Sequence, residues 1–397
     1  MQPRIVRVAV LRFLWPPGPA VSGALPSLTW PDDFYQQLFQ AQNGWSIRDY
    51  WLRASFGLLQ LEFDFSLAHW WRFGDFDQAS TSSNRNAILD DARQIVQADS
   101  PGALDRFDQI IAFVHAPPSN AGARGLASGA VLDQNAIIPF YQHEVGHMLG
   151  FEHAFGPFVP PPSTLGNVYN DPYDVMGYTN VQSHSIPTPA EFANIQSYPG
   201  KTLWQSERRP SAAALYRRFT GTAEFVQSGW VEHTSIGQRV WVASLSQADT
   251  VIPVIAIVPA IGGTGIVTIE YRTATGDDAG VTPAVVIHTI GVHPVPAGLG
   301  ETNPPWFEGT VTPTVGSSFV AVGLRFQVMT VATGSVGGVE VLVEADSPQL
   351  HGQSERRLID TSAPHIGEMA TPVTAGTREP IVEAPAREEE RLLRPPH

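Results

Sequence analysis

The 397-residue sequence contains no cysteine, which excludes disulfide bonds and cysteine-ligated metal sites. Basic residues are also scarce, because 24 Lys and Arg residues stand against 38 Asp and Glu residues and give a formal net charge of −14. This acidic balance argues against nucleic acid and anionic membranes as partners. No apolar run approaches the roughly 20 residues that a membrane-spanning helix needs, so no transmembrane segment is predicted.

The apolar N-terminus has some features of a signal peptide, but we interpret residues 4–14 as the first core strand. Arg7 and Arg12 interrupt the apolar run, and two prolines follow Trp15 where a signal peptide needs small residues for cleavage. No clear signal peptide is therefore predicted, and no pro-segment is expected upstream of this strand.

Hydrophobic periodicity predicts alternating strands and helices in the first part of the chain. Leu59 and Leu61 alternate with polar residues, as in a half-exposed strand. Ser46 is a candidate N-cap, and Asp49 follows three residues later in a weak form of the capping box. The predicted elements are a strand over 4–14, helices over 32–41 and 46–57, a strand over 59–65, a helix over 84–98, and strands over 107–114 and 125–132.

The stretch around which the chain is organised has the form His-Glu-x-x-His-x-x-Gly-x-x-His. His143 and His147 are four residues apart, so a helix places both imidazoles on one face, close enough to share a metal ion. Glu144 lies between them, where a zinc hydrolase needs a base for its water. Gly150 permits a left-handed turn that ends the helix, and His153 then returns as a third nitrogen ligand.

Three protein ligands and one open position are typical of catalytic rather than structural zinc, so one catalytic Zn²⁺ is predicted. The alternative is an amphipathic helix whose histidines are merely structural. The motif fixes five positions, which makes a chance match remote. Nothing in the sequence indicates a structural Ca²⁺ site.

The extended motif resembles the signature of the metzincin zinc endopeptidases. A second segment, residues 170–178, reads Asn-Asp-Pro-Tyr-Asp-Val-Met-Gly-Tyr and resembles the gametolysin and immune-inhibitor-A branch of that family. The resemblance implies that Met176 forms a turn beneath the metal, and Asp174 can fix this turn through backbone hydrogen bonds. It also implies that Tyr178 stabilises the transition-state oxyanion, the alternative being a tyrosine that lines the substrate pocket.

In metzincins, the last strand before the active-site helix is the sheet edge that pairs with the substrate backbone. The resemblance assigns this role to the predicted strand over 125–132, and in particular to Gly125, Leu126, Ala127, Ser128 and Gly129. An ordinary surface strand or loop is the alternative. A latency mechanism based on a cysteine switch is excluded, because the chain has no cysteine.

The predicted fold class is α+β, with a metzincin-like catalytic domain over 1–218 that combines a twisted mixed sheet with the active-site helix. β-rich runs separated by Gly-, Pro- and Asp-rich turns predict an all-β, sandwich-like domain over 219–346. Residues 347–397 are rich in Pro, Glu and Arg and are interpreted as a disordered tail. His288 and His293 are interpreted as structural or exposed rather than metal-binding.

These features predict a zinc-dependent endopeptidase that acts on protein or peptide substrates, with Glu144 as the general base. The alternative is a surface- or glycan-binding adhesion protein with a vestigial protease domain, although the intact Glu144 argues against it. A third option is zinc-dependent hydrolysis of a non-peptide amide, which the edge-strand interpretation disfavours. The resemblance implies an extracellular location, and the sequence carries no indication of oligomeric state.

Overall fold

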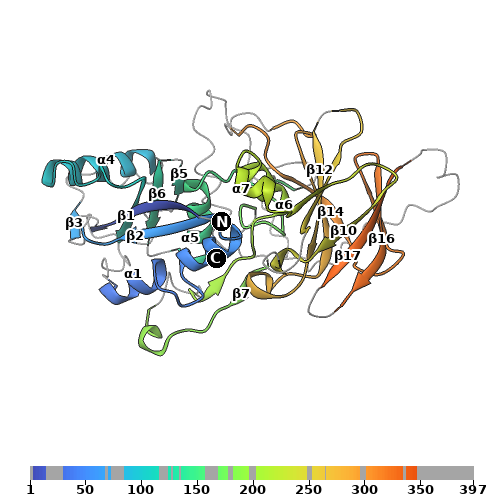
Figure 1. Ribbon diagram of the computed structural model, residues 1–397. Helices are drawn as coiled ribbons and strands as arrows, with labels where there is room; N and C mark the ends of the chain where they lie inside the picture. Colours follow the sequence, from blue (N-terminus) through green and yellow to red (C-terminus); the bar gives the residue numbers. More distant parts are fainter. Residues whose placement is uncertain are drawn as a thin grey trace, which may run out of the picture.

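The protein has one half built on a mostly parallel sheet with helices and another half built almost entirely of strands, and the two lie side by side (Figure 1). This arrangement is α+β, as predicted. The computed structural model describes residues 3–14, 30–67, 70–72, 85–115, 124–126, 128–133, 136–156, 169–177, 182–195, 203–247, 253–263, 265–295, 301–333 and 337–346. The predicted tail over 347–397 lies outside them. Within the described ranges no helix is long and apolar enough to cross a membrane.

The sheet of the first half has the order β2-β1-β4-β6-β5, and β3 also pairs with β1. Every pairing is parallel except the last, in which β5 runs antiparallel to β6. The strands are β1 (Arg4–Leu14), β2 (Leu59–Asp64), β3 (Trp70–Arg72), β4 (Gln109–His115), β5 (Arg124–Leu126) and β6 (Gly129–Asp133). The predicted first core strand is confirmed as β1, which pairs with β2, β3 and β4.

Helices cover both faces of this sheet, and β1 explains why. Val6, Val8 and Val10 on one side of β1 belong to one apolar cluster, while Leu11 and Phe13 on the other side belong to a second. The first cluster contains α1 (Asp32–Phe39), α2 (Ile47–Ala54) and α5 (Ile138–Met148), and the second contains α4 (Arg85–Asp99). All residues from Val8 to Phe13 are buried, so this part of β1 is apolar on both faces except at Arg12.

The predicted Ser46 cap at the start of α2 is confirmed, but the second hydrogen bond of the cap has a different acceptor from the predicted one. The Ser46 side chain accepts a hydrogen bond from the Asp49 backbone N–H at 3.1 Å. The Asp49 carboxylate does not return to Ser46 but accepts the Gly44 N–H at 2.8 Å. The Ser46 N–H donates instead to the Asn43 side chain at 2.8 Å. Asn43 therefore completes the cap that the capping-box pattern assigned to Asp49.

The prediction of one continuous strand over 125–132 is wrong. The structure divides it into β5 and β6, which pair with each other so that Gly125 faces Ala130 and Leu126 faces Gly129. Gly129 has a φ of 150°, and a Cβ atom at this position would collide with the Ile110 carbonyl oxygen. Glycine is therefore required where the chain enters β6 beside β4. On this side the described sheet ends at β5, and β2 and β3 lie at its other edge.

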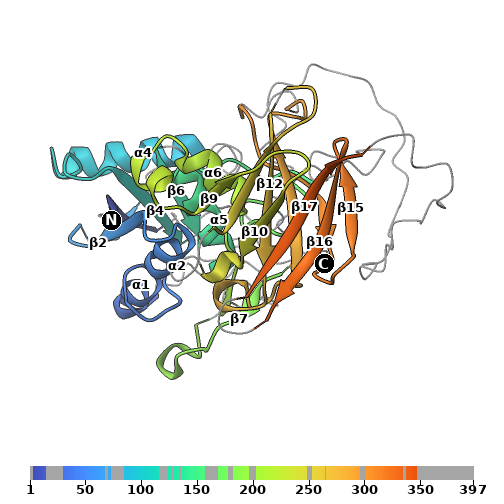
Figure 2. The ribbon, with the colours of Figure 1, turned by 45° about the vertical axis from the view of Figure 1, so that its right-hand side comes forward.

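The second half is a sandwich of two sheets with one apolar core between them (Figure 2). One sheet has the order β10-β17-β16-β15, and the other has the order β14-β13-β12-β11-β9. The strands are β9 (Val231–His233), β10 (Arg239–Ala243), β11 (Ile255–Pro259), β12 (Ile266–Arg272), β13 (Ala284–Ile290), β14 (Trp306–Val311), β15 (Ser318–Ala321), β16 (Leu324–Ala332) and β17 (Gly338–Ala345). The predicted β-run over 318–331 is two strands, joined at Val322 and Gly323 with φ values of 46° and 75°.

The apolar core does not stop at the predicted domain boundary after residue 218. Ile255 and Ile257 of β11 pack in the same cluster as Val145 of α5 and Met176, while Val258 packs in the sandwich core. The helix α6 (Ala212–Phe219) spans this boundary and α7 (Ala223–Gln227) follows it, while a small pair, β7 (His184–Ser185) with β8 (Gln205–Ser206), precedes it. The strands β11, β12 and β13 of the five-stranded sheet are thus buried on both of their faces, apart from one end residue each.

Candidate metal centre

The three histidines of the motif come from α5 and from the turn that ends it. His143 and His147 lie on α5, and Gly150, with a φ of 86°, takes the left-handed conformation that ends the helix. The Phe151 N–H then donates to the Gly146 carbonyl at 3.0 Å, which directs the chain back towards the helix. His153 follows this turn. The predicted role of Gly150 is confirmed.

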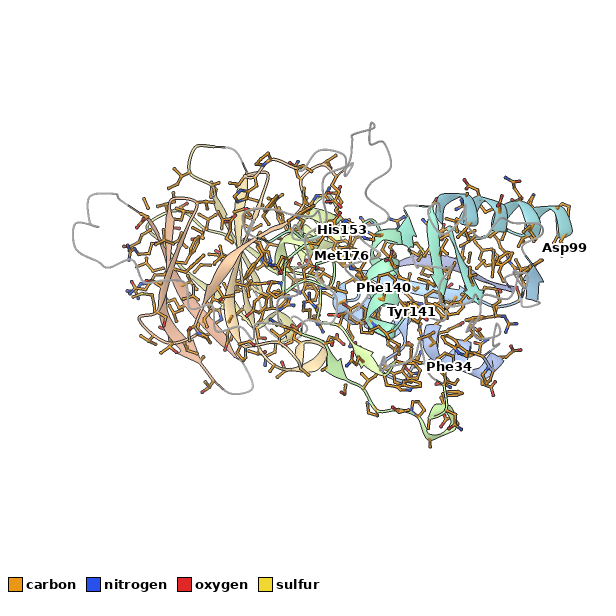
Figure 3. All side chains as sticks on the ribbon, turned by 180° about the vertical axis from the view of Figure 1, so that it is seen from behind. Phe34, Asp99, Phe140, Tyr141, His153 and Met176 are labelled. Carbon is orange, nitrogen blue, oxygen red and sulfur yellow. The ribbon has the colours of Figure 1, made fainter. Side chains whose placement is uncertain are left out.

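The three imidazoles converge on one point. The Nε2 atom of His147 lies 3.2 Å from Nε2 of His143 and 3.1 Å from Nε2 of His153. Two nitrogens that bind one ion tetrahedrally at 2.0–2.1 Å are separated by about 3.3 Å. The observed separations match this value, so the cluster could hold a metal ion. Figure 3 shows His153 near Met176, where the two halves of the protein meet.

Each imidazole is oriented by a contact on its other nitrogen. Nδ1 of His143 lies 2.7 Å from the Val175 carbonyl, and Nδ1 of His147 lies 3.0 Å from the Phe151 carbonyl. A carbonyl only accepts, so both histidines carry the proton on Nδ1 and direct the Nε2 lone pair towards the shared point. Nδ1 of His153 lies 2.5 Å from the Glu301 carboxylate. Such outer contacts are characteristic of metal-binding histidines.

Glu144 is held in the same part of α5, and its side chain is buried with 2% exposure. It precedes His147 by three residues, so the two side chains are neighbours on the helix surface. A buried carboxylate next to a metal site can exchange protons with a bound substrate or water. Glu152 lies next to His153 but belongs to a different group. Its carboxylate pairs with Arg217.

The turn at Met176 has the geometry that was predicted from Asp174. The Asp174 carboxylate accepts the Met176 N–H at 2.8 Å, and its carbonyl accepts the Gly177 N–H at 3.0 Å. Met176 is fully buried, and its carbonyl accepts the Ala154 N–H at 3.0 Å. A Cβ atom at Gly146 would collide with the Met176 sulfur. Met176 therefore packs directly against α5 at Gly146, the residue that precedes His147.

The predicted substrate-binding residues are only partly brought together. Gly125 and Leu126 lie in β5, which packs against α5. Ser128 lies between β5 and β6, and its carbonyl accepts a hydrogen bond from Arg93. Gly129 lies in β6, which is paired on both sides. Ala127, like the predicted oxyanion residue Tyr178, lies outside the described residues.

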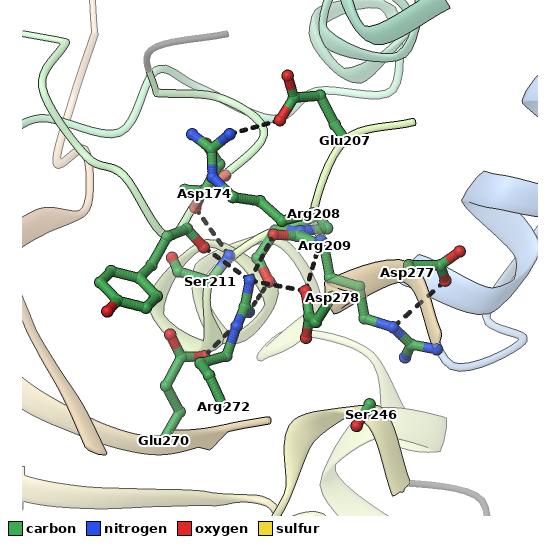
Figure 4. Close-up of polar contacts among 12 residues, drawn as sticks. Asp174, Glu207, Arg208, Arg209, Ser211, Ser246, Glu270, Arg272, Asp277 and Asp278 are labelled. Carbon is green, nitrogen blue, oxygen red and sulfur yellow. Dashed lines mark hydrogen bonds and ion pairs between the residues drawn. The ribbon is translucent and has the colours of Figure 1, made fainter. Parts of the chain in front are cut away.

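A buried polar network joins the sandwich to the Met176 turn (Figure 4). Arg272 of β12 donates to the Tyr173 carbonyl at 2.8 Å and lies 3.1 Å from the Asp278 carboxylate. The His288 imidazole of β13 lies 2.8 Å from the Asp171 carboxylate. Glu270 accepts the first N–H of α6, from Ala212, at 2.6 Å. All these side chains are almost completely buried.

The structural interpretation of the two sandwich histidines agrees with this network. His288 is an ion-pair partner of Asp171, and Nε2 of His293 lies 2.5 Å from the Glu308 carboxylate. Neither histidine belongs to the metal cluster. Sequence reasoning missed the network itself. The signal was present in β12, where Thr268, Glu270 and Arg272 alternate with apolar residues although both faces of the strand are buried.

Two groups of this network favour their protonated forms in the folded protein. Burial raises the pKa of Glu270 from 4.5 to about 7, against the opposing effects of Arg272 and His288. Burial alone lowers the pKa of His288, but the carboxylates of Asp171 and Glu270 outweigh burial and raise it above 6.5. A raised pKa means tighter proton binding in the folded than in the unfolded state. The stabilisation that each group provides is therefore complete below its unfolded pKa and is lost as the pH rises through its folded pKa.

The free energy of unfolding is thus expected to lose a contribution on the order of 2 kcal/mol between pH 5 and pH 8. Urea unfolding at both pH values, with EDTA present, measures this loss. Glu270→Gln is the control, because its amide oxygen can still accept the Ala212 N–H but does not titrate. The variant should show a smaller fall than the original chain, and an equal fall in both would contradict the assignment to Glu270.

A scan against protein-family models finds no match for this sequence, and a search of the curated proteins finds none either. The resemblance to metzincins therefore stays a prediction. The three histidines, the buried Glu144 and the turn at Met176 together form the candidate metal centre.

Proposed function

We propose that the protein is a zinc-dependent endopeptidase whose metal is held by His143, His147 and His153. The observation that carries this proposal is the convergence of three Nε2 atoms at 3.1 and 3.2 Å, with each Nδ1 already occupied. An uncharged all-nitrogen set with tetrahedral spacing suits zinc better than the hard cations Mg²⁺ and Ca²⁺, which prefer oxygen ligands. When bound, zinc polarises a carbonyl group and makes water a stronger acid.

Glu144 acts as the general base and acid. Its carboxylate takes a proton from the attacking water and delivers it to the leaving amine, which needs a group within hydrogen-bonding reach of both. The burial of Glu144 and its spacing of three residues from His147 support this role. Tyr178 remains the predicted donor to the oxyanion, by its offset of two residues from Met176.

The substrate class that we propose is an extended peptide aligned along β5. This strand ends the described sheet, so one of its sides is not paired to a further described strand. Gly125 and Leu126 can offer backbone N–H and C=O groups to a peptide on that side. β5 also packs against α5, which carries two of the histidines. By the same resemblance, we propose that the protein acts outside the cell on protein substrates.

Casein cleavage by the purified full-length chain tests this function. Cleavage should stop in 1,10-phenanthroline and return when zinc is added back. The content of zinc should be about one ion per chain and should fall to near zero in His143→Ala, because two nitrogens alone hold the ion weakly. His293→Ala is the matched control, since it removes a histidine that is paired with Glu308 outside the cluster. Unchanged zinc in His143→Ala would show that the metal binds elsewhere.

A further inference from the structure

The chain after the motif helix runs beside a segment of the sandwich half. The Phe155 N–H donates to the Pro305 carbonyl at 2.8 Å, and the Phe307 N–H donates to the Phe155 carbonyl at 2.7 Å. At the other end of this contact, the Thr302 N–H donates to the Glu152 carboxylate at 3.2 Å. Residues 152–155 and 301–307 are therefore joined by hydrogen bonds at both ends, with His153 between them.

Glu301 is the residue of that segment that reaches the metal cluster. Its Oε1 atom lies 2.5 Å from Nδ1 of His153 and also accepts the His153 backbone N–H at 3.2 Å. The side chain of Glu301 is 10% exposed. Its second oxygen is buried and has no hydrogen-bond partner in the described part of the chain. The carboxylate therefore contacts His153 through one oxygen only, Oε1.

We propose that Glu301 is a positioning residue for the third metal ligand, so that the sandwich half completes the metal site. The proposal rests on the metal site of the proposed function. Nδ1 of His143 and Nδ1 of His147 contact backbone carbonyls of the first half, whereas His153 lies on a turn outside the helix and contacts a carboxylate from the second half. A carboxylate fixes the imidazole in the Nδ1–H form and makes Nε2 a stronger donor to a cation.

The burial of Glu301 supports this role. A carboxylate with little access to water gains little from solvent and needs positive charge nearby. A cation bound at Nε2 would place positive charge on the other side of the His153 ring. The loop contact between Glu152 and Thr302 fixes the position of Glu301 along the chain, and the Phe155 contacts fix His153. Both partners of the pair are thus held by hydrogen bonds that neighbouring residues make.

The test is the zinc affinity of the full-length chain, measured by competition with a chromophoric chelator. Glu301→Gln keeps the size of the side chain and removes its charge, and the affinity should fall about 10- to 100-fold. Glu308→Gln is the matched control, because Glu308 makes the same 2.5 Å contact with His293, away from the cluster. Its zinc affinity should equal that of the original chain. The thermal midpoints of the two metal-free variants should be similar.

Two further measurements separate positioning from a general structural effect. Glu301→Asp retains a carboxylate and should recover part of the affinity that Glu301→Gln loses. The visible absorption of the Co²⁺-loaded chain should change in Glu301→Gln and not in Glu308→Gln, because only the former alters a ligand's orientation. Equal zinc affinity and an equal Co²⁺ spectrum in Glu301→Gln would overturn the inference and leave the proposed function intact. Failure of the original chain to bind zinc would overturn both.

Discussion

Glu144→Gln is expected to reduce casein cleavage on the order of 10³-fold while the zinc content stays at its original value. The amide has nearly the same shape as the carboxylate but cannot accept the proton of the attacking water. The ligands should not be disturbed, because their Nδ1 contacts go to Val175, Phe151 and Glu301. The measurement is the initial rate of cleavage together with metal analysis on the same sample.

The control for this prediction is Glu224→Gln, which removes an exposed carboxylate from α7. Its rate should equal that of the original chain. Full activity in Glu144→Gln would show that Glu144 is not the base. A parallel loss of zinc and activity would show instead that Glu144 holds the site together, and the proposed mechanism would have to be abandoned.

Arg272→Met is expected to lower the free energy of unfolding by about 3–5 kcal/mol, the range observed when one partner of a buried ion pair is removed. Arg272 is completely buried and donates to the carbonyls of Tyr173, Arg209 and Pro210. It also lies 3.1 Å from the Asp278 carboxylate. Methionine fills much of the same volume but leaves the carboxylate and the carbonyls without their donor.

Urea unfolding followed by tryptophan fluorescence measures this loss. Arg325→Met is the control within the same sandwich, because Arg325 pairs with Asp346 at 3.0 Å near the surface and is 31% exposed. An ion pair of this kind contributes less than about 1 kcal/mol. Similar losses in both variants would show that the buried network does not anchor the turn at Met176.

Local patterns in the sequence predicted much of the metal site. The spacing of His143, His147 and His153 places three nitrogens together because a helix and one left-handed turn at Gly150 determine the path of the chain. Asp174 was predicted to hold the Met176 turn because the hydrogen bond that its carboxylate accepts from the Met176 N–H spans only two residues. The hydrogen bond of the Ser46 cap spans only three residues, and this cap was also predicted.

What could not be predicted depends on contacts between distant residues. β5 is three residues long, too short to show a period of two, and it was merged with β6 into one strand. Val322 has a φ of 46°, which a β-branched residue rarely adopts, so Gly323 is the only residue that marks the turn between β15 and β16 in the sequence. Glu301 is an ordinary glutamate in the sequence. Its contact with His153 spans 148 residues, and no local rule reaches so far.

That separation also affects the order in which the site is completed during synthesis. At about 5–20 residues per second, a ribosome needs roughly 7–30 s to move from one partner to the other. The 148-residue interval therefore leaves a nascent chain with all three histidines but without the carboxylate that contacts the last of them. The contact between His153 and Glu301 forms only after most of the five-stranded sheet has emerged. The ribosome thus adds Glu301, the last residue of this site, long after the histidine motif.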